Sequence, residues 1–462
     1  MNIILTSALS GIIFMFSGFV LKDKRHQSIL ATILFIAMIV SAALQLQGCG
    51  IMLDKYPNMI ETDPYRIAFF VILCLVGIYY TLVNRYNFSK PGSKVSDYFA
   101  LIFISFTGIA VLASFNNLIL MFLGIEILSI PLYALAGAAK HKMKSTEAAV
   151  KYFLMGAFST GIMLMGVTLI YGASGSFLLE NITAYSFDFQ SIYYLGWVML
   201  ILSLCFKVSV APMHFWAPDV YDGTPTVFSS YMITIVKGAG FMTFITVLSA
   251  FKLTSGIVAD NYQYLLSFLI ILTLILGNFS ALKQTSVKRM LAYSSVVQAG
   301  FMMFALFQIN EESQNALLFY TLSYGLSSIV LFYALTKVKN EYKDFHGLSK
   351  RAPVLAFACT VALLSLAGIP FTSGFLAKFM ILSSAMYIPS NLILVIAALV
   401  LAVLSIYYYI KVIIAMYFRN SNKKKIKLSF TTQFLLVLGT ALNIALGVYP
   451  NLLWMVLDCI SK

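Results

Sequence analysis

Two stretches of this chain place a lysine inside an apolar segment close to a proline. Lys207 lies in LCFKVSVAPMHFW, five residues before Pro212, and Lys378 lies in GIPFTSGFLAKFM, eight residues after Pro370. A charge at membrane depth costs about 3 kcal/mol even on lenient insertion scales, so an intramembrane lysine usually marks an ion path. Interrupted, charged helices in corresponding halves of a chain indicate a transport site. The two stretches therefore predict ion translocation.

Three more ionisable residues fall within apolar segments: Glu126 in FLGIEILSIPLY, Lys237 in TIVKGAGF and Lys411 in IYYYIKV. A buried carboxylate and a lysine on a neighbouring helix lower each other's desolvation penalty. Moving such a pair apart would change how tightly each holds its proton, which is one way to drive proton release.

Each of these residues also has a structural interpretation. Glu126 could be a protonated or hydrogen-bonded packing residue. Lys207 and Lys237 could be bonded to carbonyls that a helix break frees. Lys411 lies within about two turns of a predicted helix end, so its ammonium could reach the interface along its flexible stem.

A proton that moves between the lysine helices needs a relay. Tyr293, Ser295 and Gln298 lie between them in sequence, in the stretch SVKRMLAYSSVVQAGF. Hydroxyl groups and water can form a hydrogen-bonded chain, although serine and threonine are also common where membrane helices pack together.

Composition excludes a soluble protein. The 462 residues are 60% hydrophobic and 10% charged, and the mean hydropathy is +0.90, which is typical of an all-α integral membrane protein. The five cysteines are far apart, and no Walker loop, GxSxG, dinucleotide fingerprint or metal-ligand spacing occurs. We therefore expect no cofactor, no metal and no covalent catalytic centre in this chain.

About 20 apolar residues span a bilayer, and the sequence predicts fourteen such segments. The first fits a retained helix better than a cleaved signal peptide, because no small-residue cleavage pattern follows it. The predicted segments are 2–21, 28–46, 66–84, 98–115, 117–139, 148–171, 192–213, 225–250, 262–281, 287–307, 315–336, 353–384, 391–417 and 429–455.

The basic residues support this count. Of the 31 lysines and arginines, 23 fall in odd-numbered loops, and only Lys55, Arg66, Lys252 and Lys462 fall in even-numbered loops or the C-terminus. Because positively charged loops stay in the cytoplasm, this asymmetry predicts cytoplasmic odd loops and both termini on the periplasmic side. A count wrong by one central helix would scramble the alternation. The net charge of +14 is explained by these loops, and nucleic acid is not an expected partner.

Taken together, the motifs resemble the antiporter-like subunits of respiratory complex I. The resemblance covers about residues 100–415 and depends on several stretches in the same order: FLGIEILSIPLY, CFKVSVAPMHFWAPDVYDGTPTVFSSY, VKGAGF, SVKRMLAYSSVVQAGF, GIPFTSGFLAKF and IYYYIKV. Within that family, the lysine at 378, the three tyrosines before Lys411 and the end of the sequence at Lys462 resemble one particular branch.

The resemblance implies fourteen transmembrane helices, of which helices 7 and 12 are broken, at Pro212 and Pro370. It also implies two inverted five-helix repeats, which divides the chain into 1–96 (three N-terminal helices), 97–251 (first repeat), 252–420 (second repeat) and 421–462 (the last helix).

The resemblance also implies roles for the ionisable residues. Glu126 and Lys207 would form a coupled pair, Lys237 a relay and Lys378 the exchange site towards the far side. Many relatives have a histidine near position 298, where this chain has Gln298. Glutamine cannot take up a proton in this pH range, so transfer there would depend on water and on Tyr293 or Ser295, with Lys411 as a further candidate.

The expected function is that of one proton channel of a redox-driven pump, in a bacterial inner membrane. Other membrane subunits of the complex would be its partners, and flavin, iron–sulfur clusters and quinone would belong to partner subunits. Three alternatives remain: a subunit of a cation/proton antiporter or membrane-bound hydrogenase complex, a stand-alone solute transporter, and a structural membrane scaffold.

Overall fold

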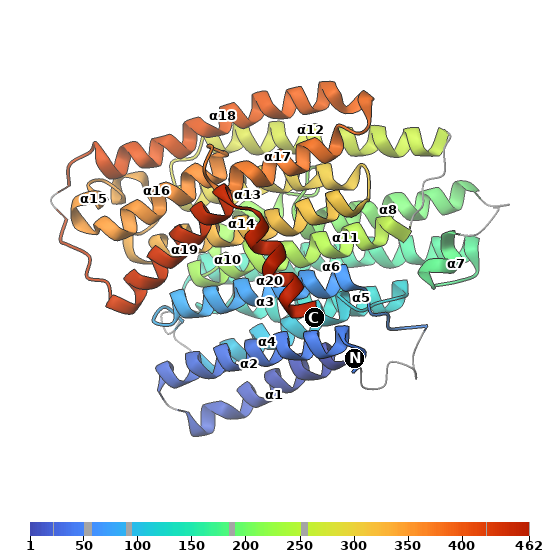
Figure 1. Cartoon of the computed structure of the whole chain (residues 1–462), viewed down its shortest axis with the longest axis horizontal. Coiled ribbons are helices and arrows are strands. Elements are labelled where there is room, and N and C mark those ends of the chain that lie inside the picture. Colours follow the sequence, from blue (N-terminus) through green and yellow to red (C-terminus); the bar gives the residue numbers. More distant parts are fainter. Residues whose placement is uncertain are drawn as a thin grey trace.

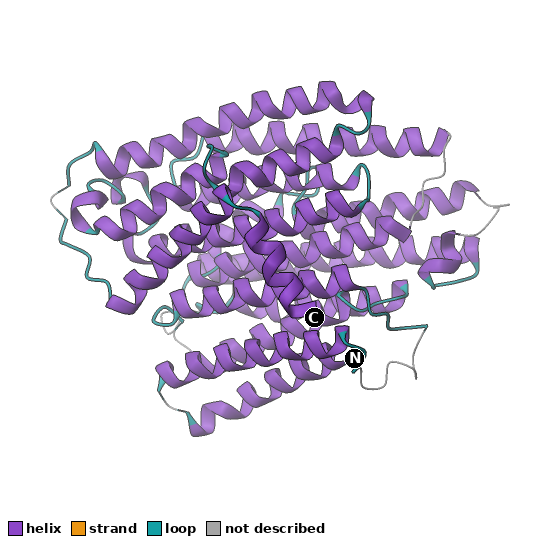
Figure 2. Cartoon of the chain, in the orientation of Figure 1, coloured by secondary structure: helices purple, strands orange, loops and turns teal. Residues whose placement is uncertain are grey.

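The computed structural model describes residues 1–21, 23–49, 58–88, 95–183, 190–250, 257–421 and 423–461. Within these ranges the regular secondary structure is entirely helical (Figure 2), and the only β contacts are isolated bridges. The predicted all-α class is therefore confirmed. The predicted boundary at 251/252 lies outside the described residues, as do Lys55, Lys252 and Lys462.

The helices, labelled as in Figure 1, are α1 (Asn2–Val20), α2 (Lys24–Leu46), α3 (Pro64–Asn84), α4 (Val95–Leu112), α5 (Leu118–Ala136), α6 (Met143–Ser174), α7 (Leu179–Thr183), α8 (Gln190–Val208), α9 (Trp216–Gly223), α10 (Thr226–Tyr231), the π-helix η2 (Met232–Val236), α11 (Lys237–Ala250), α12 (Ile257–Leu282), α13 (Val287–Met302), η3 (Met303–Leu306), α14 (Glu311–Val338), η4 (Tyr342–Asp344), α15 (Leu348–Arg351), α16 (Pro353–Ala367), α17 (Ser373–Ala385), η5 (Pro389–Asn391), α18 (Leu392–Tyr417), α19 (Phe430–Val448) and α20 (Asn451–Ser461).

Several helix starts follow directly from the sequence. The side chain of Asn117 accepts a hydrogen bond from Leu120 N at the start of α5, and Ser286 accepts one from Arg289 N at the start of α13. Asn310 forms a capping box with Ser313. These side chains satisfy backbone N–H groups that a helix N-terminus leaves free.

Twelve helices among the described residues are long and apolar enough to cross a membrane, and α16 and α17 are shorter apolar helices. The predicted segment 353–384 is therefore interrupted, because it forms these two pieces. The predicted segment 287–307 corresponds to α13 followed by η3.

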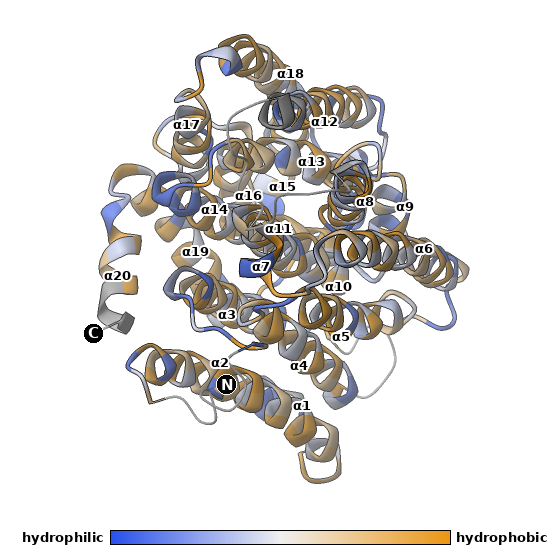
Figure 3. Ribbon diagram, turned by 90° about the vertical axis from the view of Figure 1, so that its right-hand side faces the viewer, coloured by the Kyte–Doolittle hydropathy of each residue, from blue (hydrophilic) through white to orange (hydrophobic). Residues whose placement is uncertain are grey.

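The long helices run side by side through the molecule (Figure 1), and an end-on view shows them packed as a bundle with α14 in its interior (Figure 3). In α14, 94% of the most apolar window is buried, against 33% in the span of α18. Outward side chains of α18 include Ile393 and Val403, which are 80% and 65% exposed. Such an apolar outer face is suited to lipid or to neighbouring membrane proteins.

The chain interrupts its helices near both predicted prolines. After α8, Ser209 has a φ of 57° and the Ala211–Pro212 peptide is cis, and α9 begins at Trp216. The freed backbone finds one partner in α8 and one on α12, since Val210 N donates to Cys205 O (2.9 Å) and Ala211 N donates to Thr273 Oγ1 (3.0 Å). Irregular backbone at membrane depth persists only where such partners are available.

The second interruption separates α16 from α17. Gly368 has a φ of 84° and Phe371 a φ of 68°. Gly374 N donates to Ser365 Oγ (3.1 Å), which ties the first turn of α17 back to the last turns of α16. Pro370 has no N–H, so it cannot bond the carbonyl four residues earlier, that of Leu366.

Candidate functional site

Lys207 lies in the last turn of α8, just before the first interruption. Its Nζ donates to Ser129 Oγ of α5 at 2.9 Å, and the ammonium lies 6.0 Å from the centre of the Phe206 ring. The side chain is half-buried. A hydroxyl group is therefore the direct partner of this lysine in the structure.

Glu126 precedes Ser129 by three residues on α5, close to one helical turn. No ion pair at 4.0 Å or less joins Glu126 to Lys207 among the described residues, and Glu126 Oε1 is buried without a hydrogen-bond partner there. Ser129 Oγ donates to Ile125 O (2.5 Å) while it accepts from Lys207. The two charged groups thus lie on neighbouring helices without forming the direct pair that the sequence suggested.

A small cavity of about 10 Å³ adjoins Lys207. Its walls include Ser129, Val236, Gly240 and Thr243, so it lies between α5, α8 and the helix that carries Lys237. A volume of this size is close to the room that one water molecule needs.

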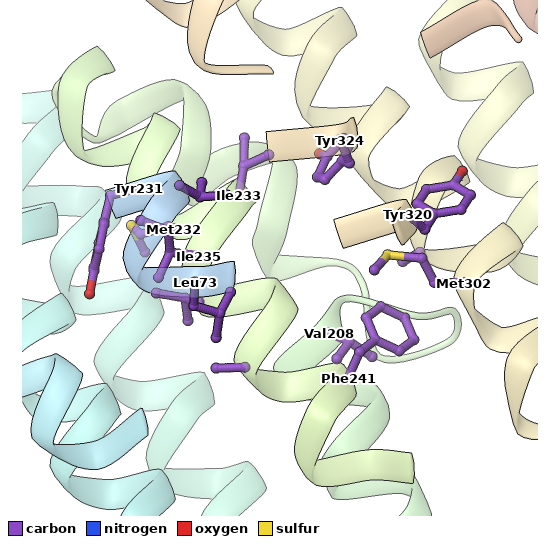
Figure 4. Packing of buried hydrophobic residues seen from close by; sticks show 14 of the residues in the cluster. Leu73, Val208, Tyr231, Met232, Ile233, Ile235, Phe241, Met302, Tyr320 and Tyr324 are labelled. Atoms are coloured by element: carbon purple, nitrogen blue, oxygen red, sulfur yellow. The ribbon is translucent and has the colours of Figure 1, made fainter. Parts of the chain in front are cut away.

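Lys237 is the first residue of α11, directly after the π-helix η2. It is 1% exposed, and its Nζ donates to Ser295 O (2.7 Å) and Ser295 Oγ (3.2 Å) of α13. Apolar side chains such as Ile233, Ile235 and Phe241 occupy this part of the core (Figure 4). Single π-turns inside helices are often found at functional sites.

Lys378 lies in α17, in the helix that follows the second interruption, and is 7% exposed. Its Nζ donates to Leu366 O (2.7 Å) and Ala367 O (3.2 Å) at the end of α16, and it lies 4.8 Å from the centre of the Phe301 ring. The lysine therefore binds the carbonyl that Pro370 leaves without a backbone donor.

Gln298 connects this lysine to a cluster of hydroxyl groups. Gln298 Nε2 donates to Leu366 O (3.0 Å) and to the Tyr409 hydroxyl (3.1 Å), and Gln298 Oε1 accepts from the Tyr320 hydroxyl (2.5 Å). Tyr409 also contacts Ser294 Oγ at 2.5 Å. Since Ser294 and Ser295 are neighbours in α13, the groups around Lys378 and Lys237 meet at adjacent residues of one helix.

The remaining relay candidates lie outside these contacts. Lys411 is exposed, and its ammonium lies 4.5 Å from the centre of the Tyr342 ring. Tyr293 is half-buried, and none of the hydrogen bonds described above includes it. The structure thus brings together Lys237 with Ser295, and Lys378 with Gln298, and leaves Lys411 on the outer face.

Sequence reasoning missed Ser129, Tyr320 and Tyr409 as partners of the predicted path. Tyr409 is fully buried within the tyrosine run that served only as a mark of resemblance. A signal for Ser129 was present in its spacing of three residues from Glu126, which places both on one side of α5.

Within the part of the chain that the structure describes, no group of three or more His, Cys, Asp or Glu side chains could hold a metal ion. The absence of a cofactor from this chain stays a prediction.

Comparison with known proteins gives consistent matches. Residues 115–405 match the family described as NADH:quinone oxidoreductase/Mrp antiporter, transmembrane. A relative named NADH-quinone oxidoreductase subunit N, from Flavobacterium psychrophilum, is 38% identical over 86% of this chain and 88% of its own length. The protein of the same name from Cytophaga hutchinsonii is 35% identical over 98% of both chains. Among solved structures, a chain of Thermus thermophilus respiratory complex I with bound aureothin has a TM-score of 0.81 and 29% identity, over 99% of both chains.

Proposed function

We propose a proton path for this chain, which belongs to the NADH:quinone oxidoreductase/Mrp antiporter family of membrane subunits. The resemblance inferred from the motifs is confirmed, including its branch, because the relatives carry the name subunit N. The chain is thus an antiporter-like, proton-translocating membrane subunit. In our proposal, protons pass through Glu126, Lys207, Lys237 and Lys378, with Ser295 as a relay hydroxyl and Gln298 as the amide that positions the neighbouring hydroxyl groups.

The proposal depends on one observation: the hydrogen-bond partners of Lys237 and Lys378, the two most deeply buried lysines of the proposed path. Lys237 and Lys378 each donate two hydrogen bonds to neutral carbonyl or hydroxyl oxygens. An ammonium has three N–H donors, and the neutral amine still has two. Either lysine can therefore lose a proton and keep both contacts. A lysine that only joined helices together would be better served by a carboxylate partner.

The order of groups follows the contacts. Glu126 and Lys207 form the first coupled pair, and Ser129, one turn from Glu126 on α5, holds the ammonium of Lys207. Lys237 receives the proton across the small cavity that adjoins Lys207 and Val236, and Lys378 exchanges it with the far side. Lys411 stays outside this path because its ammonium lies on the exposed face of α18.

The proposal includes fourteen membrane spans in four parts: 1–96, 97–251, 252–420 and 421–462, with inverted repeats in the two middle parts. The twelve long apolar helices support the count, which reaches fourteen if α16 and α17 form one broken span and α13 continues through η3 as another. The position of the lysine-rich loops supports a periplasmic location for both termini.

The chain would act within an NADH-quinone oxidoreductase in a bacterial inner membrane, beside other membrane subunits. Quinone reduction in partner subunits, which would hold the flavin, the iron–sulfur clusters and the quinone, would provide the energy. Each lysine's charge would then bias the charge state of its neighbour.

The test is Lys378→Met in the intact complex, assayed as proton uptake per quinone reduced in membrane vesicles. We expect at least a tenfold fall in uptake through this subunit, because methionine fills the space and cannot carry a proton. Lys337→Met is the control, since Lys337 is a half-buried lysine at the end of α14 that faces the Tyr333 ring. Full uptake at full redox turnover in Lys378→Met would remove Lys378 from the path.

A further inference from the structure

A pocket that contains no residue of the proton path lies between α2, α3, α14 and α20. It has a volume of about 420 Å³, which is within the usual range for ligand pockets. α20 lies at the edge of the bundle (Figure 3) and contributes Trp454 and Leu457, which are three residues apart on one helix face. The end of α2 and the starts of α3 and α14 surround its mouth. In the orientation proposed above, these helix ends face the periplasm.

Polarity changes along the α14 wall of this pocket. The lining residues in the first turns of the helix are Glu311, Gln314 and Asn315, and the next one is Leu318. This spacing belongs to one face of a helix, and seven residues of helix span about 10 Å. Leu318 is 2% exposed. A polar mouth therefore leads within about 10 Å to an apolar interior.

The α3 wall has the same gradient. Tyr65, Ala68 and Val71 line it at the spacing of one helix face, and Val71 is 0% exposed. Tyr65 Oη is buried and has no hydrogen-bond partner among the described residues. Buried polar groups in folded proteins nearly always have a partner. The wall thus places an unused hydroxyl group within two turns of an apolar surface.

The mouth of the pocket has an acidic group beside two amides. Glu311 is exposed and is the one charged residue among the described residues that line the pocket. Gln314 and Asn315 are half-buried. A carboxylate accepts hydrogen bonds from an ammonium group, and side-chain amides donate to phosphate oxygens. The mouth is therefore complementary to a head group that carries both an ammonium and a phosphate.

We propose that this pocket binds phosphatidylethanolamine from the periplasmic leaflet. The ammonium group would donate to the Glu311 carboxylate, and the phosphate would accept from the amides of Gln314 and Asn315. The Tyr65 hydroxyl would donate to the phosphate or to an ester oxygen, and the upper part of one acyl chain would lie along the apolar walls of α3 and α14. The inference concerns lipid binding and does not depend on the proton path.

The charge and the depth of the pocket favour this lipid over other occupants. A head group with a net negative charge would lie near Glu311, and no basic side chain among the described lining residues would offset it. The quaternary nitrogen of a choline head group has no N–H to donate. A water-soluble ligand would gain nothing from the buried apolar surface of Val71 and Leu318. Trp454 is of a residue type that is enriched where membrane and water meet, which fits a mouth at the depth of the head groups.

The first test compares lipids in the unaltered complex. The intact complex is placed in vesicles that contain a phospholipid with a photoreactive diazirine in one acyl chain, with an ethanolamine, a choline or a glycerol head group at equal mole fraction. Tandem mass spectrometry after illumination locates the labelled residues. Because Val71 and Leu318 are buried, lipid at the outer surface cannot reach them. We expect these two residues to be labelled at least fivefold more by the ethanolamine lipid than by either other lipid, relative to total labelling of the complex.

The second test compares Glu311→Gln with Glu312→Gln. Both glutamates lie in the first turn of α14, but only Glu311 lines the pocket, whereas Glu312 faces Tyr387. We expect Glu311→Gln to reduce the preference for the ethanolamine lipid to less than twofold, and Glu312→Gln to keep the preference of the parent.

Three results would overturn the proposal. Equal labelling of the pocket by the three lipids would exclude a site for a head group, and this result needs no variant. A preference that Glu311→Gln left unchanged would exclude the carboxylate as the partner of the ammonium. Absence of label from both Val71 and Leu318, in a complex labelled elsewhere, would show that no acyl chain enters the pocket and would indicate that another subunit covers it.

Discussion

Lys378 and Gln298 donate hydrogen bonds to the same atom, the carbonyl oxygen of Leu366, at 2.7 and 3.0 Å. This oxygen is available because α16 ends at its C-cap, Gly368, which has a φ of 84°, and because Pro370, four positions after Leu366, has no N–H to offer. A helix break, a buried lysine and a buried amide are therefore one unit. A change to any one of them alters the acceptors of the other two.

Gln298→Leu should disturb this unit most directly. The substitution removes donors to Leu366 O and Tyr409 and the acceptor of Tyr320. A buried polar group left without a partner costs about 1–3 kcal/mol. We expect a lower melting temperature of the complex, measured by differential scanning fluorimetry, and proton uptake reduced about tenfold.

The exposed Gln308 provides the matched control, since Gln308→Leu changes the same chemistry outside the buried network and should leave both quantities near those of the parent. If Gln298→Leu kept the parent melting temperature and the parent uptake, the shared carbonyl would have no role beyond local packing.

Ser129→Ala tests the hydroxyl that accepts the hydrogen bond of Lys207. Removing Ser129 Oγ takes away the partner of Lys207 Nζ, and a hydrogen bond to a charged group contributes about 1.5–3 kcal/mol. We expect proton uptake to fall roughly tenfold, whereas Ser129→Thr, which keeps the hydroxyl, should retain most of it. Equal uptake in the alanine and threonine variants would show that Lys207 does not need this contact.

The helix breaks could be predicted from the sequence, and the direct partners could not. Pro370 cannot donate a backbone hydrogen bond to the carbonyl of Leu366 whatever its surroundings, because the missing N–H is a property of the residue. Whether Lys207 meets Glu126 or Ser129 depends on the rotation of α5, since residues three apart differ by only about 60° around a helix. A rotation of that size is set by the packing of neighbouring helices, which the sequence pattern does not resolve.

The same limit explains the different positions of Tyr409 and Lys411. The two residues are two positions apart, so they point to nearly opposite sides of α18. Tyr409 is fully buried, and Lys411 lies on the exposed face. From the sequence alone, a lysine in an apolar segment is a reasonable candidate for the path. Only the structure shows which face of α18 packs against the other helices, and therefore that Tyr409 joins the hydrogen-bond network. The π-helix at 232–236 likewise has no marker in the sequence.

Stability of the loop after α18 should depend on pH through Asp344. Partial burial raises the pKa of the Asp344 carboxyl, but hydrogen bonds from Lys423 and from the backbone N–H of Glu341 outweigh it, so the pKa lies below its usual 3.8. Lys423 Nζ lies 2.6 Å from Asp344 Oδ1. A lowered carboxyl pKa stabilises the folded state above the unfolded value, and this contribution is lost as pH falls through the folded value.

Hydrogen exchange of peptides spanning 423–428 would measure this effect, because Ile426 N donates to Arg351 O in the same segment. After correction for intrinsic rates, Asp344→Asn should exchange up to about fivefold faster than the parent above pH 5, which corresponds to roughly 1 kcal/mol for a partly exposed pair. The difference should shrink as pH falls below 3.8. A difference that stayed constant down to pH 2 would rule out the Asp344 charge as its cause.

Gly374→Ala should separate α17 from α16 and so move Lys378 away from its acceptors. A Cβ at Gly374 would lie 1.9 Å from Ser365 O, whereas a Cβ at Gly161 would meet no atom within 4 Å. Overpacking of this kind typically costs about 1–3 kcal/mol, and here the helix that must yield carries Lys378. We expect less assembled complex, a lower melting temperature and at least a tenfold loss of uptake in the fraction that assembles. Gly161→Ala on α6 should lower none of the three, because it adds a methyl group to open space and alanine favours the helix by about 1 kcal/mol. If Gly374→Ala assembled and took up protons normally, the contact between α16 and α17 would be loose enough to absorb a methyl group. The acceptors of Lys378 would then not depend on the close approach of these two helices.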